Sequence, residues 1–497
     1  MRNPAELCEQ VRNISCKRSG CVVSDPNGDH RVVVIGGGLA GLATTTALAS
    51  RGLGVTLLES RPRLGGRASS FVDQTTGQLI DNCQHVNMGC CTNFRFFCET
   101  VGIADRLERQ PALYFIGPNG TQTMFSASWL PAPLHLFPAF RRLDYLSRKD
   151  LTCIARGLKS LAKLSPDQNE STESFADWLA RHNQTPNAIE RFWFVVLVSA
   201  LSESLDRIDV ASARKVFVDG FMANRDGWTV EIPTVPLSEF YGETLENWLA
   251  SHAVDVQLLT GVKALRTEND RVTQVELRDG STITGDHFVL AVPHHRVLAL
   301  LPEEWRTHPQ IQAVDELESA PISSVHLWFD RPITDLPHAV LIEKTSQWLF
   351  NRGLTDQSSS FSGHYYQVVI SASRDLSGRS SEEIVEEVVD ELKSVWPNSL
   401  DANLLHSRFV TEHRAVFSVR PEAKRCRLPQ QSPIENLQFA GDWTQTGWPA
   451  TMEGAVRSGY LAAENILRHT INDPTSVLQP DLPTGWLSRR LFGLSSQ

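Results

Sequence analysis

The chain has 497 residues, enough for two packed domains, and 41% hydrophobic and 21% charged residues make it an ordinary globular enzyme. Its formal charge of -10, from 47 basic and 57 acidic residues with no long basic run, argues against a nucleic-acid-binding protein. Its nine cysteines are an odd number without paired C-x-x-C spacing, so we expect free thiols in a reducing compartment and no metal site.

The N-terminal residues 1–30 precede the first predicted strand, and we expect them to form a disordered extension. They have mixed charge and lack the apolar core of a signal peptide. The longest apolar run, residues 192–201, is too short to span a bilayer. These features favour a cytoplasmic protein without a transmembrane segment.

A glycine-rich turn lies between a predicted strand and a predicted helix. Residues 32–35 are a β-branched apolar run typical of a buried parallel strand, and residues 39–50 have the Ala- and Leu-rich composition of a helix packed on a sheet. The turn matches the G-x-G-x-x-G pattern at Gly36, Gly38 and Gly41. In this pattern the first glycine permits the tight turn, the second a close approach of a pyrophosphate, and the third the contact of helix with strand.

The same region offers groups for the rest of a dinucleotide. The helix N-terminus, at Leu39 and Ala40, presents unpaired N–H groups and a partial positive charge to a pyrophosphate. A second predicted strand, residues 55–58, ends in Glu59, where a carboxylate can accept hydrogen bonds from a ribose diol. Strand, glycines, helix, second strand and acid therefore arrive in the order of a Rossmann-like dinucleotide fold.

The residues after Glu59 indicate which dinucleotide binds. Residues 63–67 resemble the R-x-G-G-R sequence of FAD enzymes in the flavin-containing amine oxidoreductase superfamily. Its two glycines let the backbone pass close to the cofactor, and Arg67 can neutralise a phosphate with a forked pair of hydrogen bonds. A nicotinamide dehydrogenase does not need this second element, so the predicted cofactor is FAD.

A predicted hairpin over residues 69–80 leads into a D-N-x-Q-H sequence that ends at His85. Here the chain begins to resemble the hydroxysqualene dehydroxylases, also called squalene-associated FAD-dependent desaturases, and residues 325–332 and 345–352 strengthen that resemblance. The family is expected to carry Gly where this chain has Cys83. If the position needs a positive φ, Cys83 would be strained there.

Two further segments are both apolar and basic. Residues 129–142 are broken by prolines and closed by two arginines, and residues 486–494 have the same amphipathic character. The first segment fits either a buried loop of the substrate domain or a membrane-surface patch where a lipid substrate enters. The sequence leaves both interpretations open. Under the second, these segments would contact the inner face of the cytoplasmic membrane.

The last part of the chain returns to the cofactor. In the superfamily, the residue matching Val262 contacts the adenine through its backbone. Gly441, Asp442 and the residues that follow resemble the superfamily's G-D…E-G-A…S-G signature. The resemblance implies that Asp442 accepts hydrogen bonds from the ribityl or phosphate region. It also implies that a helix from Thr451 and Met452 points its N-terminus at the isoalloxazine.

These motifs predict an α/β fold in which a Rossmann-like FAD-binding domain is interleaved with an α+β substrate-binding domain. The FAD-binding domain is discontinuous because its motifs lie at both ends of the chain. Its predicted segments are 31–90, 240–300 and 410–470, those of the substrate domain are 91–239 and 301–409, and a tail follows over 471–497.

The resemblance implies an FAD-dependent oxidoreductase that converts hydroxysqualene to squalene in hopanoid- or sterol-type triterpene synthesis. Loss of water leaves an allylic cation that reduced flavin can quench with a hydride, while the protein protonates the leaving oxygen and excludes bulk water. His85 is the first candidate acid, with a structural histidine bonded to backbone as the alternative. His294, His295 and Glu203 are weaker candidates.

Three other functions remain open. A carotenoid or polyprenoid desaturase would pass hydride from its substrate to oxidised flavin. An amine oxidase would frame its amine with aromatic side chains, for which only Trp443 and Trp448 stand near Asp442. A non-catalytic flavoprotein would act as a partner of squalene-forming enzymes. The predicted dehydroxylase also needs an electron donor to reduce its flavin, which the sequence does not identify.

Overall fold

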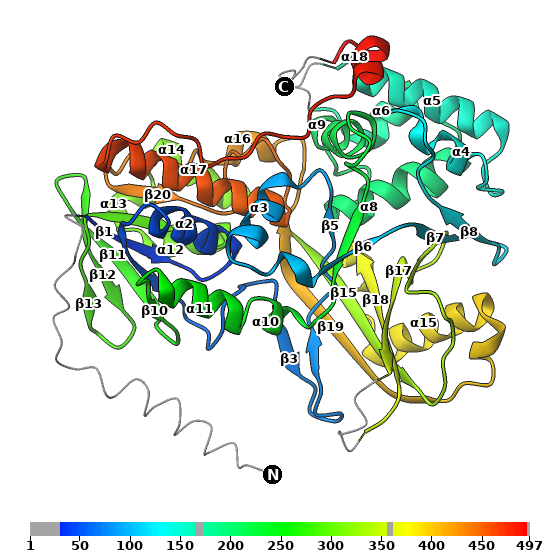
Figure 1. Ribbon diagram of the computed structural model, residues 1–497, viewed down its shortest axis with the longest axis horizontal. Helices are drawn as coiled ribbons and strands as arrows, with labels where there is room; N and C mark the ends of the chain where they lie inside the picture. Colours follow the sequence, from blue (N-terminus) through cyan, green and yellow to red (C-terminus); the bar gives the residue numbers. More distant parts are fainter. Residues whose placement is uncertain (1–29, 165–171, 355–360, 495–497) are drawn as a thin grey trace.

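The computed structural model describes residues 30–164, 172–354 and 361–494 (Figure 1). The predicted extension over residues 1–30 lies outside the described residues except for His30. Two sheets organise the rest of the chain: a parallel sheet on the left of Figure 1 and a larger mixed sheet on the right.

The parallel sheet has five strands in the order β10-β2-β1-β14-β20, and every pairing in it is parallel. Its central strand is almost completely buried from Val32 to Ile35, because neighbouring elements cover both faces. The strands are β1 (Arg31–Ile35), β2 (Gly54–Leu58), β10 (Asp255–Gln257), β14 (His287–Leu290) and β20 (Leu437–Phe439). The predicted Rossmann-like parallel sheet is confirmed.

Two helices from opposite ends of the chain pack together over this sheet, α2 (Leu39–Ala49) and α17 (Met452–Thr470) (Figure 1). The Thr44 hydroxyl donates to the Gly459 carbonyl at 3.1 Å, and a Cβ atom at Gly459 would overlap the Ala40 carbonyl oxygen. Close backbone contact therefore joins residues about four hundred positions apart. Further helices on this side are α3 (Thr92–Thr100), α10 (Leu237–Phe240), α11 (Glu243–Ser251), α12 (His294–Leu300), α13 (Glu303–Arg306), α14 (Pro309–Gln312) and α16 (Ala423–Cys426).

Three small antiparallel sheets stand beside the two large ones. The predicted hairpin after Arg67 is confirmed as β3 (Ser70–Val72) and β4 (Leu79–Asp81). The other strands are β11 (Val262–Glu268), β12 (Arg271–Leu277) and β13 (Thr282–Ile283) in one sheet, and β5 (Asn87–Met88), β9 (Val230–Pro233) and β6 (Leu107–Gln110) in another.

The larger sheet has seven strands in the order β19-β15-β18-β17-β16-β7-β8. Helix α15 (Ser381–Val395) packs its buried residues Ile384, Val388 and Leu392 into one apolar cluster with this sheet. The strands are β7 (Leu113–Ile116), β8 (Gln122–Phe125), β15 (Ser319–Phe329), β16 (His338–Leu341), β17 (Trp348–Leu354), β18 (His364–Ser371) and β19 (Leu404–Phe417).

A group of helices stands above the larger sheet in Figure 1. The sequence predicts helices over 143–164, 174–182 and 187–205. In the structure the first of these is the shorter helix α5 (Arg148–Ala162). The last is interrupted by a π-helical turn, η3 (Ile189–Phe194). The helices are α4 (Phe137–Phe140), α5 (Arg148–Ala162), α6 (Phe175–Arg181), α7 (Pro186–Ala188), α8 (Val195–Leu201), α9 (Val210–Arg214) and α18 (Trp486–Phe492), with a second π-helical turn, η4 (Lys215–Met222). Among the described residues no helix is both long and apolar enough to cross a membrane.

The two large sheets draw their strands from different segments of the chain. Strands of the parallel sheet come from all three segments predicted to bind FAD. Strand β19 runs from 404 to 417 within the larger sheet, so it crosses the boundary predicted at residue 410. The assignment of the segments to two domains otherwise stays a prediction.

Candidate active site

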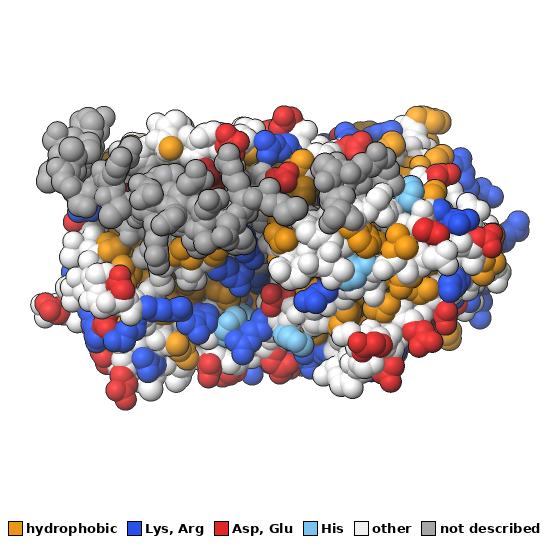
Figure 2. All heavy atoms as spheres, turned by 90° about the horizontal axis from the view of Figure 1, so that it is seen from below, with side chains coloured by type: hydrophobic (Ala, Val, Ile, Leu, Met, Phe, Trp, Pro, Cys, Tyr) orange, Lys and Arg blue, Asp and Glu red, His pale blue; other side chains and the backbone are white. Residues whose placement is uncertain are grey.

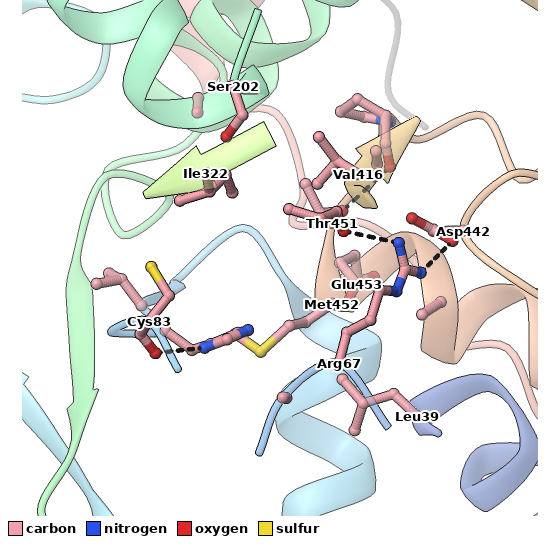
Figure 3. Close-up of a pocket in the computed structure, with 18 of the residues that line it drawn as sticks. Leu39, Arg67, Cys83, Ser202, Ile322, Val416, Asp442, Thr451, Met452 and Glu453 are labelled. Atoms are coloured by element: carbon pink, nitrogen blue, oxygen red, sulfur yellow. Dashed lines mark hydrogen bonds and ion pairs between the residues drawn. The ribbon is translucent and has the colours of Figure 1, made fainter. Parts of the chain in front are cut away.

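A cavity of about 740 Å³ lies between the two large sheets. Every predicted cofactor-binding residue except Gly41 lines it, and so does His85, the first candidate acid. The residues concerned are Gly36, Gly38, Leu39, Ala40, Glu59, Arg67, His85, Val262, Gly441, Asp442, Thr451 and Met452. The structure thus brings together motifs from both ends of the chain, and Figure 3 shows part of this arrangement.

The three glycines of the first turn have different surroundings. Gly36 has a φ of +114°, and a Cβ atom there would overlap the Ala291 carbonyl oxygen, while one at Gly41 would overlap the carbonyl oxygen of Gly36. A Cβ atom at Gly38 would instead meet only the Cα atom of Gly66, at 3.8 Å. The fold itself requires the first and third glycines, whereas the second keeps open a space in the cavity where a pyrophosphate can approach the backbone.

Glu59 lies at the end of β2 with its carboxylate turned toward the glycine turn. Its Oε2 accepts a hydrogen bond from the Gly37 N–H and its Oε1 one from the Arg61 N–H, both at 2.8 Å. A carboxylate has about four acceptor positions in all, so Glu59 retains the capacity to accept from a ribose hydroxyl.

Arg67 and Asp442 form an ion pair at the centre of the cavity wall. An Arg67 Nη2–H donates to Asp442 Oδ1 at 2.6 Å, and Nη1 donates to the Ala415 carbonyl at 2.7 Å (Figure 3). Burial alone would lower the pKa of Arg67, but the Asp442 carboxylate outweighs it and the pKa is raised. The forked donors predicted for a phosphate are thus divided between a carboxylate and a carbonyl, a pairing that the sequence did not predict.

Helix α17 begins where the sequence predicts it. The Thr451 hydroxyl oxygen accepts a hydrogen bond from the Gly454 N–H at 3.0 Å and so caps the helix. Thr451 and Met452 line the cavity, which places the positive end of a long helix at its wall. In the same helical turn, the buried side chain of Glu453 points toward α3. Its carboxylate accepts hydrogen bonds from the backbone N–H groups of Asn93 and Phe94.

His85 lines the cavity with its ring hydrogen-bonded to backbone. Its Nδ1 lies 2.9 Å from the Cys83 carbonyl oxygen, as drawn at Cys83 in Figure 3. A carbonyl only accepts, so Nδ1 carries the proton and Nε2 of the neutral ring is an acceptor. Burial lowers the pKa of His85, and the ring is therefore neutral at neutral pH. This state suits a proton acceptor better than the predicted proton donor.

The weaker acid candidates have other positions. Glu203 and His294 do not line the cavity, and the buried Glu203 is paired with Arg374 at 2.8 Å. His295 does line the cavity, and burial lowers its pKa to about 4. Cys83 is not among the described residues with a positive φ, so the strain considered from the sequence does not arise.

The part of the cavity away from the glycine turn is lined mainly by apolar side chains from both the helical group and the larger sheet. Trp348 stands in this wall, where its indole N–H donates to the Ser199 hydroxyl at 2.8 Å. Of the two tryptophans near Asp442, only Trp448 lines the cavity, because the Trp443 indole is buried and donates to the Val292 carbonyl. The aromatic members of the wall include Phe115, Phe125, Phe140, Phe192, Phe221, Trp228, Trp348 and Phe350.

Lys215 is a cavity residue that sequence reasoning missed. It begins the π-helical turn η4 and forms ion pairs with Asp219 at 2.6 Å and Asp481 at 3.0 Å. Its ammonium group also lies 4.4 Å from the centre of the Trp448 ring. Asp219 is four residues away, but Asp481 is 266 positions away and no motif marks Lys215, so only the fold reveals its place at the cavity.

Comparison with known proteins adds independent findings. Residues 39–467 match the family described as flavin containing amine oxidoreductase. The chain is 28% identical to 15-cis-phytoene desaturase of Capsicum annuum over 470 residues, which cover 89% of this chain and 78% of the relative. It is 27% identical to 15-cis-phytoene desaturase of Synechococcus elongatus, covering 88% of this chain and 96% of the relative.

Solved structures share the fold at low sequence identity. An oxidoreductase from Methanosarcina mazei aligns with a TM-score of 0.67 at 16% identity, covering 88% of this chain and all of the other. A putrescine oxidase aligns with a TM-score of 0.64 at 15% identity, covering 89% of this chain and 99% of the other.

The chain therefore belongs to the flavin-containing amine oxidoreductase family. It is an FAD-dependent oxidoreductase, and the open space at Gly38 and the helix N-terminus at Thr451 fit that cofactor.

Proposed function

We propose that this member of the flavin-containing amine oxidoreductase family acts on a long polyprenoid hydrocarbon, and that it introduces a double bond into that chain. The observation that carries the proposal is the lining of the cavity. One part of it carries groups suited to a dinucleotide, and the adjoining part is an apolar, aromatic wall. The phytoene desaturase relatives support the same class of substrate. This proposal favours desaturation over the hydroxysqualene dehydroxylation implied by the sequence resemblance.

Within this proposal the chain's own residues bind, shield and deprotonate the substrate. The aromatic wall holds an extended hydrocarbon and keeps water away from its reacting carbons. Bound FAD supplies the hydride acceptor, so that a hydride and a proton leave neighbouring carbons and a double bond forms. The acceptor nitrogen of His85, Nε2, takes the proton, since Nδ1 is already bonded to the Cys83 carbonyl.

Reductive dehydroxylation of hydroxysqualene is the second candidate. Asn82, Cys83, Gln84 and His85, which carry the D-N-x-Q-H resemblance, all line the cavity, and this observation favours it. The reaction needs a proton donor beside the leaving hydroxyl, whereas the lowered pKa of His85 keeps its ring neutral. An amine oxidase is less well supported, because Trp443 is turned away from the cavity.

A pair of anaerobic single turnovers tests these functions. Oxidised enzyme mixed with a polyprene such as phytoene is expected to give the more unsaturated product together with bleaching of the flavin. Reduced enzyme mixed with hydroxysqualene is expected to stay reduced and to form no squalene. Squalene formation with flavin reoxidation would instead establish the second candidate. A bound flavin that reacts with neither substrate would support a non-catalytic partner of other enzymes.

Substitution of His85 tests its role in proton transfer. His85→Phe is expected to lower the turnover rate by about 10²- to 10⁴-fold while flavin remains bound, because the proton acceptor is lost. In the native enzyme the rate should be flat at alkaline pH and fall as acid protonates the ring, since burial holds the pKa of His85 below its ordinary value. A proton-donor role would give the opposite slope. Cys83→Gly is the neighbouring control and should turn over at nearly the native rate.

A further inference from the structure

Two segments that are far apart in the sequence each carry large exposed apolar side chains. Trp129 is 85% exposed and Phe137 52%, and in the C-terminal segment Trp486 is 60% and Leu491 46% exposed. Both strongly exposed tryptophans of the described chain thus belong to the two segments that the sequence marks as apolar and basic. Such rings are unfavourable in water unless a partner covers them.

The fold brings these two segments together. An Arg225 Nη1–H donates to the Leu130 carbonyl at 2.7 Å, and the neighbouring Asn224 amide donates to the Pro483 carbonyl at 2.8 Å. A Cβ atom at Gly485, just before α18, would lie 3.9 Å from the Cβ atom of Ala132. The segments around residues 130 and 485 are therefore neighbours, held by the chain that follows η4.

Helix α18 is fixed in place rather than loosely attached. The buried Ser488 hydroxyl donates to the Met222 carbonyl at 2.6 Å, and Phe492 packs against the buried cluster of Ala162, Val218 and Met222. With this inner face occupied, Trp486 and Leu491 remain outside. Figure 1 shows α18 at the top of the molecule, beside α5.

Helix α5 adds a basic stripe next to this surface. At 3.6 residues per turn its exposed basic side chains fall within an arc of about 100°, opposite the buried Ile154 and Leu161. The stripe comprises Arg148, Lys149, Arg156, Lys159 and, directly after the helix, Lys163. A single-sided stripe of this kind is typical of a helix that lies against an anionic surface.

Within the described residues, the basic side chains of these segments form no ion pairs with acidic groups. None of the five in the stripe, nor Arg141, Arg142, Arg489 and Arg490, forms an ion pair within the described residues. Asp144 is the exposed acid among them, whereas Asp150 is buried in the cap of α5. This concentration of positive charge stands out in a chain of formal charge -10. The lower face, seen in Figure 2, mixes acidic and basic side chains instead.

We propose that residues 129–142, 148–163 and 486–491 form one basic–apolar face that binds the surface of an anionic bilayer. The exposed tryptophans and Phe137 enter the headgroup region, and the surrounding lysines and arginines meet the lipid phosphates. A second copy of this chain fits the face poorly, because pairing two such faces would bring like charges together.

The same face leads toward the cavity. Helix α4 presents Phe137 to the outside, and Phe140, one helical turn further along, lines the cavity. We infer that a lipid leaving the bilayer would enter the cavity beside α4. This step rests on the proposed function, whereas bilayer binding rests on the surface alone.

Flotation of the full-length holoenzyme with vesicles tests the proposal without any substrate. We expect binding to vesicles of phosphatidylcholine mixed with phosphatidylglycerol, weaker binding to phosphatidylcholine alone, and release from the mixed vesicles by high salt. Failure to bind the mixed vesicles at low salt, or equal binding to both kinds, would overturn the proposal.

Two matched variants locate the binding face. Arg156→Gln/Lys159→Gln removes one arginine and one lysine from the stripe and should weaken partitioning onto the mixed vesicles by about 10- to 30-fold. Arg408→Gln/Lys424→Gln removes the same charges from exposed positions outside the face and should change binding less than about 2-fold. Equal losses in both variants would contradict a specific face.

Trp129→Ser/Trp486→Ser tests the apolar part and should also weaken vesicle binding. The variant should retain bound flavin and native turnover of substrate in detergent, yet lose turnover of substrate embedded in vesicles. Loss of turnover in detergent as well would contradict entry from the bilayer. A concentration-dependent dimer that this variant abolishes would assign the face to protein association and overturn the proposal. If native enzyme binds vesicles but turns over no polyprene, the proposed function fails and bilayer binding stands.

Discussion

The two halves of the cavity differ in how they are built. The half beside the glycine turn is made of backbone atoms and a few side chains at strand and helix ends, such as Glu59 and Thr451. The other half is an aromatic wall whose members, such as Phe125, Phe192 and Trp348, come from a strand, a π-helical turn and another strand. A nucleotide demands fixed backbone geometry within a short stretch of chain, whereas a hydrocarbon demands only apolar surface, which many distant residues can supply.

The largest expected effect is in the glycine turn. Gly41→Val should prevent the turn from forming, because its side chain would overlap the Gly36 carbonyl, and we expect protein without flavin. Gly38→Ala should fold, since a Cβ atom there meets only Gly66, yet bind FAD roughly 100-fold more weakly as its methyl group occupies the pyrophosphate space. Circular dichroism measures folding and flavin absorbance the occupancy. Normal FAD binding by Gly38→Ala would show that the pyrophosphate lies elsewhere.

The Arg67–Asp442 pair comes next in expected size. Arg67→Gln should weaken FAD binding by about 10- to 100-fold, because a buried carboxylate is left without its charged partner beside the cofactor. Adding Asp442→Asn should restore part of the affinity, which a titration of the deflavinated protein with FAD can measure. Arg61→Gln is the control, because within the described part of the chain the Arg61 guanidinium donates to the Gly66 carbonyl and pairs with no carboxylate. If the double variant binds no better than Arg67→Gln, the pair does not act as a unit.

The smallest expected effect lies in the apolar half and concerns substrate length. A second cavity of about 380 Å³ shares Val195, Ser199 and Ser371 with the main one, and the Trp348 indole bonds to Ser199 at this junction. Trp348→Ala should join the two spaces and shift the preference among polyprenes toward longer chains by about 10-fold, an effect of the size expected when an apolar pocket gains or loses a few carbons. Competition between chains of two lengths measures it. Trp348→Phe keeps an aromatic ring between the two cavities. An equal shift in chain-length preference in that variant would therefore contradict the role of Trp348 in separating them.

Sequence reasoning reached the nucleotide half because its signals are local. The turn at Gly36, the hairpin after Arg67 and the cap at Thr451 each combine one residue type with its immediate neighbours, and each stands where the sequence predicts it. The sequence does not reveal the Arg67–Asp442 pair, because its members are 375 positions apart and the motif of each predicts a separate contact with the cofactor.

For the apolar half of the cavity, the sequence predicts a region rich in apolar residues but not which of them form the wall. Residues 187–205 have helical spacing, but that spacing does not reveal the π-helical turn η3 that carries Phe192 at the cavity wall. Strand β19 crosses the domain boundary predicted at residue 410, because its extent is set by pairing with β15 and not by a local turn signal. Lys215 resembles a surface lysine that pairs locally with Asp219, four residues on, until the fold brings Asp481 and the cavity to it.

The strand order of the parallel sheet also has a consequence for biosynthesis. Strand β1 is made early, but its neighbour β14 and the edge strand β20 follow about 250 and 400 residues later. At ribosomal speeds of about 5–20 residues per second, the first strands wait roughly 20–80 s for that edge. During this time the apolar run from Val32 to Ile35 has no complete sheet to join. Slower transcription, lower growth temperature and abundant chaperones should therefore raise the yield of flavin-loaded protein more than any change at the C-terminal tail.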